Sequence, residues 1–445
     1  FSALAGELAD AWDKAWLMRA VKAAEVVFMG LGLAGLWFQS VPLLLLALFC
    51  MGLHSTIFGP VKYSIMPQHL REHEVMGGTG LIEAGTFLAI LGGQLLAGIV
   101  PPWEAGLIAT GLAVQGFAVS LLVPAAPRIA KVGITRNPSV STWQVLKAGH
   151  EGKGVWLSIL GISWFFAIGA VLVSEFLPLV SGNLGGREEV VTLFLIVFSV
   201  AIALGSMLVN KLLRGEVSAR YVPISALAMA VFMLDLWWAT RSFVVVTPHA
   251  DIAQFVATPG SWRILFDLTG MAVAGGMFIV PLYAILQTKS PPEGRSRVIA
   301  ANNIVNAAVI VGVVGVALAL LAAGVSIPGI IGTMGFATLA VALISCLLLP
   351  DTVLKHSIRA ILKLLYRIDV HGAENMPKPG ERAVVVVNHV SWLDGLLLAV
   401  FLPGKPVFAV NTAITKRWWI QPALKLFRAF PVDPTNPMSA KAMVR

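Results

Sequence analysis

The sequence predicts an all-α polytopic membrane protein that continues, after residue 350, into the first part of a soluble α/β domain. Hydrophobic residues make up 57% of the 445 and charged residues only 12%, which leaves too little polar surface for a soluble protein of this size. Apolar segments close to the ~20 residues that cross a bilayer recur along the chain. Beyond Pro350 the sequence turns basic, because residues 351–445 hold 13 Lys and Arg against 6 Asp and Glu.

Ten apolar segments are long enough to span a membrane: 21–38, 41–58, 77–100, 104–123, 154–180, 190–210, 221–240, 263–287, 298–324 and 328–349. Residues 1–9 look like the end of an earlier span, so we expect the chain to be cut at its start and, beyond Arg445, at its end. Cys50 and Cys346 lie inside apolar runs, and we therefore expect no disulfide and no metal site.

The charges between the segments predict an orientation. Sixteen Lys and Arg fall on one side of the predicted spans and three, Arg187, Arg241 and Arg263, on the other. Because loops rich in Lys and Arg stay in the cytoplasm, the rich side is predicted to be cytoplasmic. The even number of later crossings places the C-terminal domain there too.

A weak internal repeat divides the membrane part into two halves. Residues 8–10 with Lys14 match 208–210 with Arg214, and residues 75–85 match 298–308, which aligns Glu83 with Asn306. We therefore expect an N-terminal half over 1–123, a central cytoplasmic loop over 124–153 and a C-terminal half over 154–350. The whole would have two sets of six spans, with the first span and most of the second missing here.

The run from Gly6 to Asp10, GELAD, is followed by Lys14 and Arg19. It resembles the cytoplasmic loop signature of the major facilitator superfamily, which implies that fold. An acidic residue at a helix end, facing basic residues across the loop, can hold two helices together in one access state. We therefore predict a gating set that consists of Asp10, Lys14, Asn210 and Arg214. The alternative is that these charges only set the topology.

Two further runs, FGPVKYSIMP at 58–67 and LIEAGT at 81–86, resemble the bacterial lysophospholipid transporter family. The resemblance extends over most of residues 1–350 and implies a single-chain lipid as substrate. Lys62 and Tyr63 would then lie at headgroup depth, where an ammonium can hold a lipid phosphate. Alternatively, Lys62 only anchors its helix at the interface.

Ionisable residues inside spans are costly and therefore candidates for function. The predicted spans contain Glu83, Glu175, Asp235 and Asp267. We favour Glu83 with Asn306 as a polar gate, with Asn302 and Asn303 one turn away, and keep Glu175 as a further substrate contact. The two aspartates are interpreted as interfacial.

The segment 352–368 carries basic residues at four-residue spacing beside an apolar face: Lys355, Arg359, Lys363 and Arg367. This pattern predicts an amphipathic helix on an anionic membrane surface, with a solvated linker helix as the alternative. A short strand at 383–387 and a helix from about residue 392 are expected to follow.

The run from Asn388 to Asp394, NHVSWLD, resembles the hallmark of the glycerophospholipid acyltransferase family, a histidine and an aspartate five positions later. The resemblance implies that His389 is the general base for a hydroxyl and that Asp394 orients its imidazole. The structural alternative is that Ser391 and Asp394 form a helix capping box.

The runs at 406–410 and 430–438 resemble the bacterial bifunctional enzyme family that reacylates 2-acyl-glycerophosphoethanolamine. Where the wider family has an arginine after Asp433, this chain has Pro434, so we assign phosphate binding to Lys416, Arg417 and Arg428 instead. The resemblance implies acyl carrier protein as partner and acyl donor, and ATP for a ligase domain beyond residue 445; no other cofactor is expected. As far as the chain extends, it is expected to be inactive as an enzyme.

Three functions follow from these observations. The first is a flippase for lysophosphatidylethanolamine-type lipids that is joined to its own acyltransferase. The second is an exporter of drugs or small solutes whose tail only docks on the membrane. The third is an acyltransferase anchored by a membrane domain that transports nothing.

Overall fold

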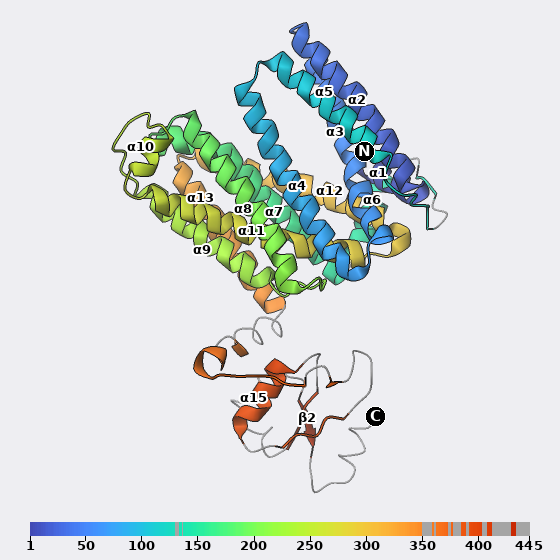
Figure 1. Ribbon diagram of the computed structural model, residues 1–445, viewed down its shortest axis with the longest axis vertical. Helices are drawn as coiled ribbons and strands as arrows, with labels where there is room; N and C mark the ends of the chain where they lie inside the picture. The colour runs from blue at the N-terminus through green and yellow to red at the C-terminus, as the bar shows by residue number, and fades with distance from the viewer. Residues whose placement is uncertain are drawn as a thin grey trace. The chain divides into compact units, whose positions relative to one another are not determined.

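The computed structural model describes residues 1–129, 133–135, 137–348, 358–359, 362–372, 375–376, 384–388, 391–402, 407–411 and 429–432. The chain folds as two compact units, Phe1–Ala342 and Leu343–Arg445. The first unit is a helical bundle (Figure 1).

The helices of the first part of the bundle are α1 (Ser2–Ala11), α2 (Lys14–Trp37), α3 (Val41–His69), α4 (Glu72–Ile99), α5 (Pro102–Ser120) and α6 (Pro138–His150). The second part contains α7 (Lys153–Pro178), the π-helix η1 (Leu179–Asn183), α8 (Glu188–Leu213), α9 (Val222–Arg241), α10 (Ile252–Ala257), α11 (Ser261–Lys289), the 3-10 turn η2 (Pro292–Gly294), α12 (Arg295–Ala322) and α13 (Ile327–Leu348).

Among the described residues, nine helices are long and apolar enough to cross a membrane: α2, α3, α4, α7 with η1, α8, α9, α11, α12 with η2, and α13. The tenth predicted segment is also helical, as α5, which contains Glu104 and Gln115 and is not among these nine. The prediction of an all-α polytopic bundle is thus confirmed.

The segment predicted as a central cytoplasmic loop, 124–153, contains helix α6. Asn137 caps this helix by accepting hydrogen bonds from the amides of Ser139 (3.0 Å) and Val140 (3.3 Å). Pro138 occupies the first position, where its missing N–H costs nothing. These two residues are a start signal that the sequence reasoning overlooked.

The most extensive contacts between the N-terminal half (α1–α5) and the C-terminal half (α7–α13) are those of α1 with α12 and of α4 with α8 (Figure 1). Helix α3 also packs on α12, and α4 on α11. Glycine permits the α1–α12 and α4–α8 approaches. A Cβ on Gly6 would lie 2.6 Å from that of Ala300, and a Cβ on Gly80 would lie 2.7 Å from the carbonyl oxygen of Ser206. Within the halves, α2 packs between α3 and α5, and α11 packs against α8 and α9.

In the second unit, β1 (Ala409–Asn411) pairs in parallel with β2 (Phe430–Val432), and α15 (Trp392–Phe401) begins where a helix was predicted. The strand predicted at 383–387 is not formed by the described residues 384–388. A strand requires a hydrogen-bonded neighbour, and the side chains of Val384 and Val386 are instead 78% and 91% exposed.

Part of the predicted amphipathic segment is described. Residues 358–359 and 362–365 are helical, Leu362 is buried, and Leu364 and Leu365 are exposed. The guanidinium of Arg359 lies 4.9 Å from the ring centroid of Phe401 in α15, so this basic side chain packs within its own unit.

Candidate functional site

A buried polar group joins α3, α4 and α11 in the bundle. The hydroxyl of Tyr63 donates a hydrogen bond of 2.5 Å to Oε1 of Glu83, and both side chains are buried. The ring of Tyr63 stacks on that of Tyr283, with the centroids 4.4 Å apart and the planes 11° from parallel. Because Tyr283 belongs to the C-terminal half, this stack links the two halves directly beside a carboxyl group.

Lys62 extends the same group. Its Nζ lies 4.5 Å from the ring centroid of Tyr63, and its charge interacts with that of Glu83. The structure thus brings together three of the residues that the sequence singled out, Lys62, Tyr63 and Glu83. A cation and a carboxyl group side by side, with a phenol hydroxyl between them, can bind a ligand that carries both charges.

Three asparagines of α12 lie along this region. Asn302 is fully buried beside Tyr283, and in the described part of the chain neither its amide nitrogen nor its amide oxygen makes a hydrogen bond of normal geometry. The amide nitrogen of Asn303 lies 3.0 Å from where a Cβ on Gly59 would stand, so Gly59 gives it room. Buried amides of this kind usually have a partner, and a polar ligand would supply one for Asn302.

The predicted pair of Glu83 and Asn306 is not formed. The hydrogen-bond partner of Glu83 is Tyr63, and Oδ1 of Asn306 is buried without a hydrogen bond to any described residue. The internal repeat relates two polar positions, Glu83 and Asn306. Positions related by the repeat need not touch, because the helices of each half pack against different neighbours.

Two more polar contacts join the halves near this site, and the sequence reasoning missed both. Nε2 of Gln287 donates to Oγ1 of Thr79 over 3.1 Å, and the hydroxyls of Ser64 and Ser296 are 3.0 Å apart. All four side chains are buried. Each bond connects the N-terminal half to the C-terminal half, so these contacts hold the halves in the arrangement seen here.

Asp10 reaches across to the other half. Its carboxylate accepts hydrogen bonds from the amides of Ser296 (3.0 Å) and Arg297 (3.1 Å), at the N-terminus of α12, and Nε of Arg297 lies 3.4 Å away. Burial raises the pKa of this carboxyl group, while the bonds from Ser296 act in the opposite direction. The prediction that Asp10 faces the basic residues of its own loop was therefore incomplete, because a helix terminus also attracts a carboxylate.

The rest of the predicted gating set lies at the two crossings. Lys14, next to Asp10, is only 2% exposed. The amide nitrogen of Asn210 lies 3.2 Å from the Cβ position of Gly77, at the crossing of α4 and α8. Arg214 ends α8 in a left-handed conformation with φ of 51°. The repeat thus relates the α1–α12 crossing to the α4–α8 crossing.

The described part of the acyltransferase motif is the start of α15. The amide of Ser391 donates to Oδ2 of Asp394 over 2.7 Å, and the amide of Leu393 donates to Oγ of Ser391 over 3.2 Å. The capping box, which was the structural alternative, is therefore formed. It fixes Asp394 at the helix start. His389, Lys416, Arg417 and Arg428 lie outside the described residues.

Residues 1–311 match the family model described as Major Facilitator Superfamily. The chain belongs to the major facilitator superfamily. Residues 367–445 match the family model described as Acyltransferase, so this superfamily member carries an acyltransferase domain at its C-terminal end. The arrangement of a membrane transporter fused to an acyltransferase domain is confirmed.

Two relatives carry the same name. The chain is 26% identical to the lysophospholipid transporter LplT of Citrobacter koseri over 311 residues, which cover 68% of this chain and 72% of the relative. It is also 26% identical to the lysophospholipid transporter LplT of Salmonella gallinarum over 317 residues, which cover 68% of this chain and 71% of the relative.

Solved structures support the fold. The crystal structure of the human organic anion transporter MFSD10 superimposes with a TM-score of 0.61 and 13% identity, over 77% of this chain and 79% of that one. The Escherichia coli fucose:proton symporter FucP gives a TM-score of 0.56 and 12% identity, over 77% of this chain and 85% of that one. At such low identity these likenesses concern the fold alone.

In this major facilitator protein, a second buried cluster of ionisable residues was missed by the sequence reasoning. It consists of Lys22 and Glu25 on α2 and His54 on α3, whose side chains are 20%, 15% and 7% exposed. All three lie in membrane-length helices. The rule that singled out Glu83, an ionisable residue inside a span, would also have found Glu25 and His54.

The remaining predicted residues lie apart from the Tyr63–Glu83 group. Glu175 of α7 is 8% exposed and comes just before the π-helix η1. Arg263 pairs with Asp235 through two hydrogen bonds, one of them 3.0 Å from Nε, and both side chains are more than a third exposed. The interpretation of Asp235 as interfacial fits this exposure.

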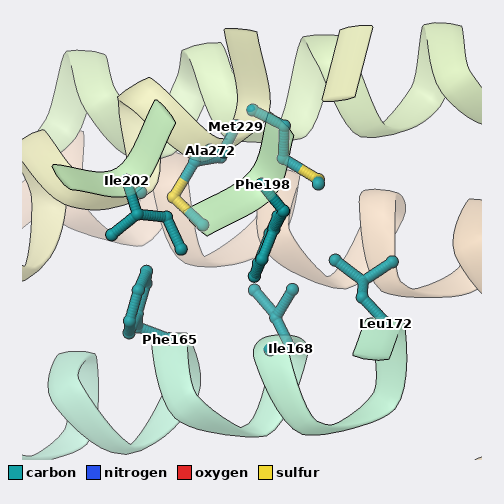
Figure 2. A pocket seen from close by; sticks show the side chains of 10 residues that line it. Phe165, Ile168, Leu172, Phe198, Ile202, Met229 and Ala272 are labelled. Atoms are coloured by element: carbon teal, nitrogen blue, oxygen red, sulfur yellow. The ribbon is translucent and has the colours of Figure 1, made fainter. Parts of the chain in front are cut away.

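The C-terminal half contains a cavity of about 10 Å³, lined by apolar side chains of α7, α8, α9 and α11 (Figure 2). Phe165 and Ile168 of α7 lie on one side of it, and Phe198 and Ile202 of α8 point toward them from the other (Figure 2). It is too small for any ligand larger than a water molecule and offers no polar group to hold one. This cavity is a packing gap and not a binding site.

Proposed function

We propose that the membrane domain flips lysophospholipids of the lysophosphatidylethanolamine type from the outer to the inner leaflet of the bacterial inner membrane. The relatives named lysophospholipid transporter support this proposal. The observation that carries it is the group of Lys62, Tyr63 and Glu83 at the junction of the two halves, with Asn302 nearby. A transporter must hold its substrate where the halves meet, so that rocking can expose it to either side.

The charges of this group fit a zwitterionic headgroup. The ammonium of Lys62 would bind the lipid phosphate, and the carboxyl group of Glu83 would bind the headgroup ammonium. Asn302, whose amide makes no hydrogen bond of normal geometry to a described residue, would donate to a phosphate or glycerol oxygen. The single acyl chain would lie against apolar surface, and a large exposed apolar surface is present on α3, including Leu45, Leu48 and Phe49.

The acyltransferase domain would restore the second acyl chain on the cytoplasmic side. His389 takes the proton from the free hydroxyl of the lysolipid, and the oxygen attacks the thioester carbonyl of acyl-acyl carrier protein. An ester bond forms, the carbon–sulfur bond breaks, and the carrier thiol leaves with the proton that His389 held. Asp394, fixed at the start of α15, orients the imidazole, and Lys416, Arg417 and Arg428 bind the phosphate.

Proteoliposomes that contain the protein test this proposal. Labelled lysophosphatidylethanolamine should move between leaflets with the wild type and with His389→Ala, which loses only acylation. Lys62→Met should lower the flipping rate by roughly 10-fold, the value of one charge-assisted bond. Lys211→Met, at an exposed lysine near the end of α8, is the matched control and should flip normally. If the wild type leaves the labelled lipid in the leaflet where it started, the flippase is rejected. The exporter of drugs or small solutes then remains.

A further inference from the structure

Asn302 differs from the other buried amides of the membrane domain. It is fully buried, and in the described part of the chain neither its amide nitrogen nor its amide oxygen has a hydrogen-bond partner of normal geometry. The other described amide side chains with a buried unpaired atom lack a partner only for the oxygen: Gln68, Asn210, Gln287 and Asn306. Asn302 therefore offers a donor and an acceptor together, at a place where leaving both without a partner is costly.

Two contacts place Asn302 at the depth of the proposed headgroup site. The hydroxyl of Ser296 on α12 lies 3.0 Å from that of Ser64 on α3, and Asn303 lies beside Gly59. The two helices therefore run side by side in opposite directions. Asn302 comes level with the stretch of α3 between Gly59 and Ser64, which contains the proposed headgroup residues of that helix.

The polarity of α12 changes one turn beyond Asn302. Asn306 is the last polar side chain of the helix, and residues 307–322 are all Ala, Val, Ile, Gly or Leu. The asparagines thus lie between the polar contacts at the start of α12 and a wholly apolar remainder. A lysophospholipid has the same order along its length: a charged headgroup, a glycerol with a free hydroxyl, and one acyl chain.

The donors and acceptors of such a lipid assign a partner to the amide. In the proposed headgroup site, Lys62 binds the phosphate and Glu83 binds the ammonium. A phosphate diester only accepts hydrogen bonds and an ammonium only donates them, whereas the free glycerol hydroxyl does both. The hydroxyl is therefore the group of the lipid that can satisfy the nitrogen and the oxygen of Asn302 together.

We propose that Asn302 binds the free hydroxyl of the lysolipid and thereby selects lysophospholipids against diacyl phospholipids. This inference rests on the proposed function and adds to it a basis for specificity. In a diacyl lipid the hydroxyl is replaced by an ester, which accepts but cannot donate a hydrogen bond, so the amide oxygen stays unpaired. Sites that pair a substrate hydroxyl reject analogues that lack it, because their own buried groups are then left without a partner.

Access to Asn302 depends on the movement of the halves. In the arrangement seen here the side chain is enclosed where α12 packs on α3, at the junction of the two halves. The hydroxyl reaches it when the halves separate, as the rocking of a transporter requires.

Two single-chain lipids separate the effect of the hydroxyl from the bulk of a second chain. Proteoliposomes that contain the protein receive labelled lysophosphatidylethanolamine or its deoxy analogue, in which a hydrogen atom replaces the hydroxyl. The wild type should flip the lysolipid roughly 10-fold faster than the analogue. Asn302→Leu, which removes both hydrogen-bonding atoms, should flip the two lipids at similar rates. Asn183→Leu, at a half-buried asparagine of η1, is the matched control and should keep the wild-type ratio.

The rate with the deoxy analogue also shows whether the variant is folded. Asn302→Leu should flip this lipid at least as fast as the wild type, because it leaves no buried amide unpaired at this position. If Asn302→Leu moves neither lipid, the ratio of the two rates in the smaller variant Asn302→Ala decides instead.

The outcomes separate the inference from the proposed function. Equal rates for the two lipids with the wild type overturn the role of Asn302 and leave the flippase standing, and so does a wild-type ratio in the deciding variant. If the wild type moves neither lipid, the flippase is rejected and the inference falls with it.

Equilibrium binding in detergent separates recognition from movement. In competition with labelled lysolipid, the wild type should bind the lysolipid roughly 10-fold more tightly than the deoxy analogue. Asn302→Leu should bind the two about equally. A wild-type preference in flipping without a preference in binding would assign the effect of the hydroxyl to the movement of the halves, and would overturn the proposed contact.

Discussion

The two halves of the membrane domain differ in what they bury. In the most apolar 18-residue stretch of each helix, 11% of the residues of α2 and α3 and 17% of those of α4 are buried, against 50% in α7, α8 and α9 and 72% in α11. The exception in the C-terminal half is α12, with 6%. The C-terminal half supplies most of the large hydrophobic cluster, including the side chains around the small gap in Figure 2. Interacting ionisable groups of low exposure lie on α2, α3 and α4. Others lie elsewhere: Asp10 of α1 pairs with Arg297 of α12, and the C-terminal half buries Asp267 of α11.

This difference indicates a division of roles. Close apolar packing makes the C-terminal half a firm support, since interiors packed at high density resist deformation. The N-terminal half carries the charges that a polar headgroup would contact. From this division of roles we expect substitutions in the C-terminal half to act mainly on stability, and substitutions in the N-terminal half to act mainly on binding and transport.

The largest effect is expected for Gly205→Ala in α8. The new Cβ would lie 2.0 Å from the carbonyl oxygen of Val273 in α11, so the two helices would have to separate. We expect a loss of about 3 kcal/mol or more in the free energy of unfolding, visible as a lower thermal midpoint in detergent. Gly92→Ala in α4, where nothing lies within 4 Å, is the control and should be neutral or gain up to ~1 kcal/mol. Equal effects at both sites would remove the contrast between the halves.

A smaller effect is expected for Lys22→Met in α2, which leaves the carboxylate of Glu25 without its ammonium partner. Because the pair is partly exposed, we expect a loss of about 2 kcal/mol, less than for a fully buried pair. The double variant Lys22→Met with Glu25→Gln should recover most of the thermal stability. If the double variant is no more stable than the single one, the ion pair has no role in holding α2 to α3.

A still smaller effect is expected for Gln287→Leu, which removes the hydrogen bond to Thr79 between the halves. The hydroxyl of Thr79 still donates to the carbonyl oxygen of Val75, so the loss should be about 1 kcal/mol, or a five-fold shift toward separated halves. Spin labels at positions 72 and 289, in a background without the two native cysteines, would report the distance. Thr333→Val, which removes a bond within one helix, should leave that distance distribution unchanged.

The smallest effect is expected at the exposed pair of Arg263 and Asp235 in the C-terminal half. Exposed ion pairs contribute little, because water screens the charges and the side chains lose entropy. Arg263→Gln should leave the thermal midpoint and the flipping rate of the wild type unchanged within error. A clear loss of transport would show that the C-terminal half also contacts the substrate at its exposed surface.

Much of this architecture could be predicted from the sequence, and the reasons for the misses are physical. Periodic apolar segments mark helices wherever they pack, so every predicted span is found as a helix. The local sequence pattern does not show which helices contact one another. Gln287 is hydrogen-bonded to Thr79, 208 residues away in the sequence, and Asp10 to Ser296, 286 residues away. Glu83 could be named in advance because ionisable groups inside spans are costly, and Lys62 and Tyr63 because their run resembles the lysophospholipid transporter family. Their partner Tyr283 could not, since a tyrosine in a helix is unremarkable alone.

The stacked pair of Tyr63 and Tyr283 has a practical consequence. The chain has only four tyrosines, and two of them lie face to face where the halves meet. Biosynthetic incorporation of fluorotyrosine would therefore give a fluorine spectrum with four resonances, two of which carry the ring-current shift of a close aromatic neighbour. Separation of the halves during a transport cycle would move those two signals and leave the other two as internal references.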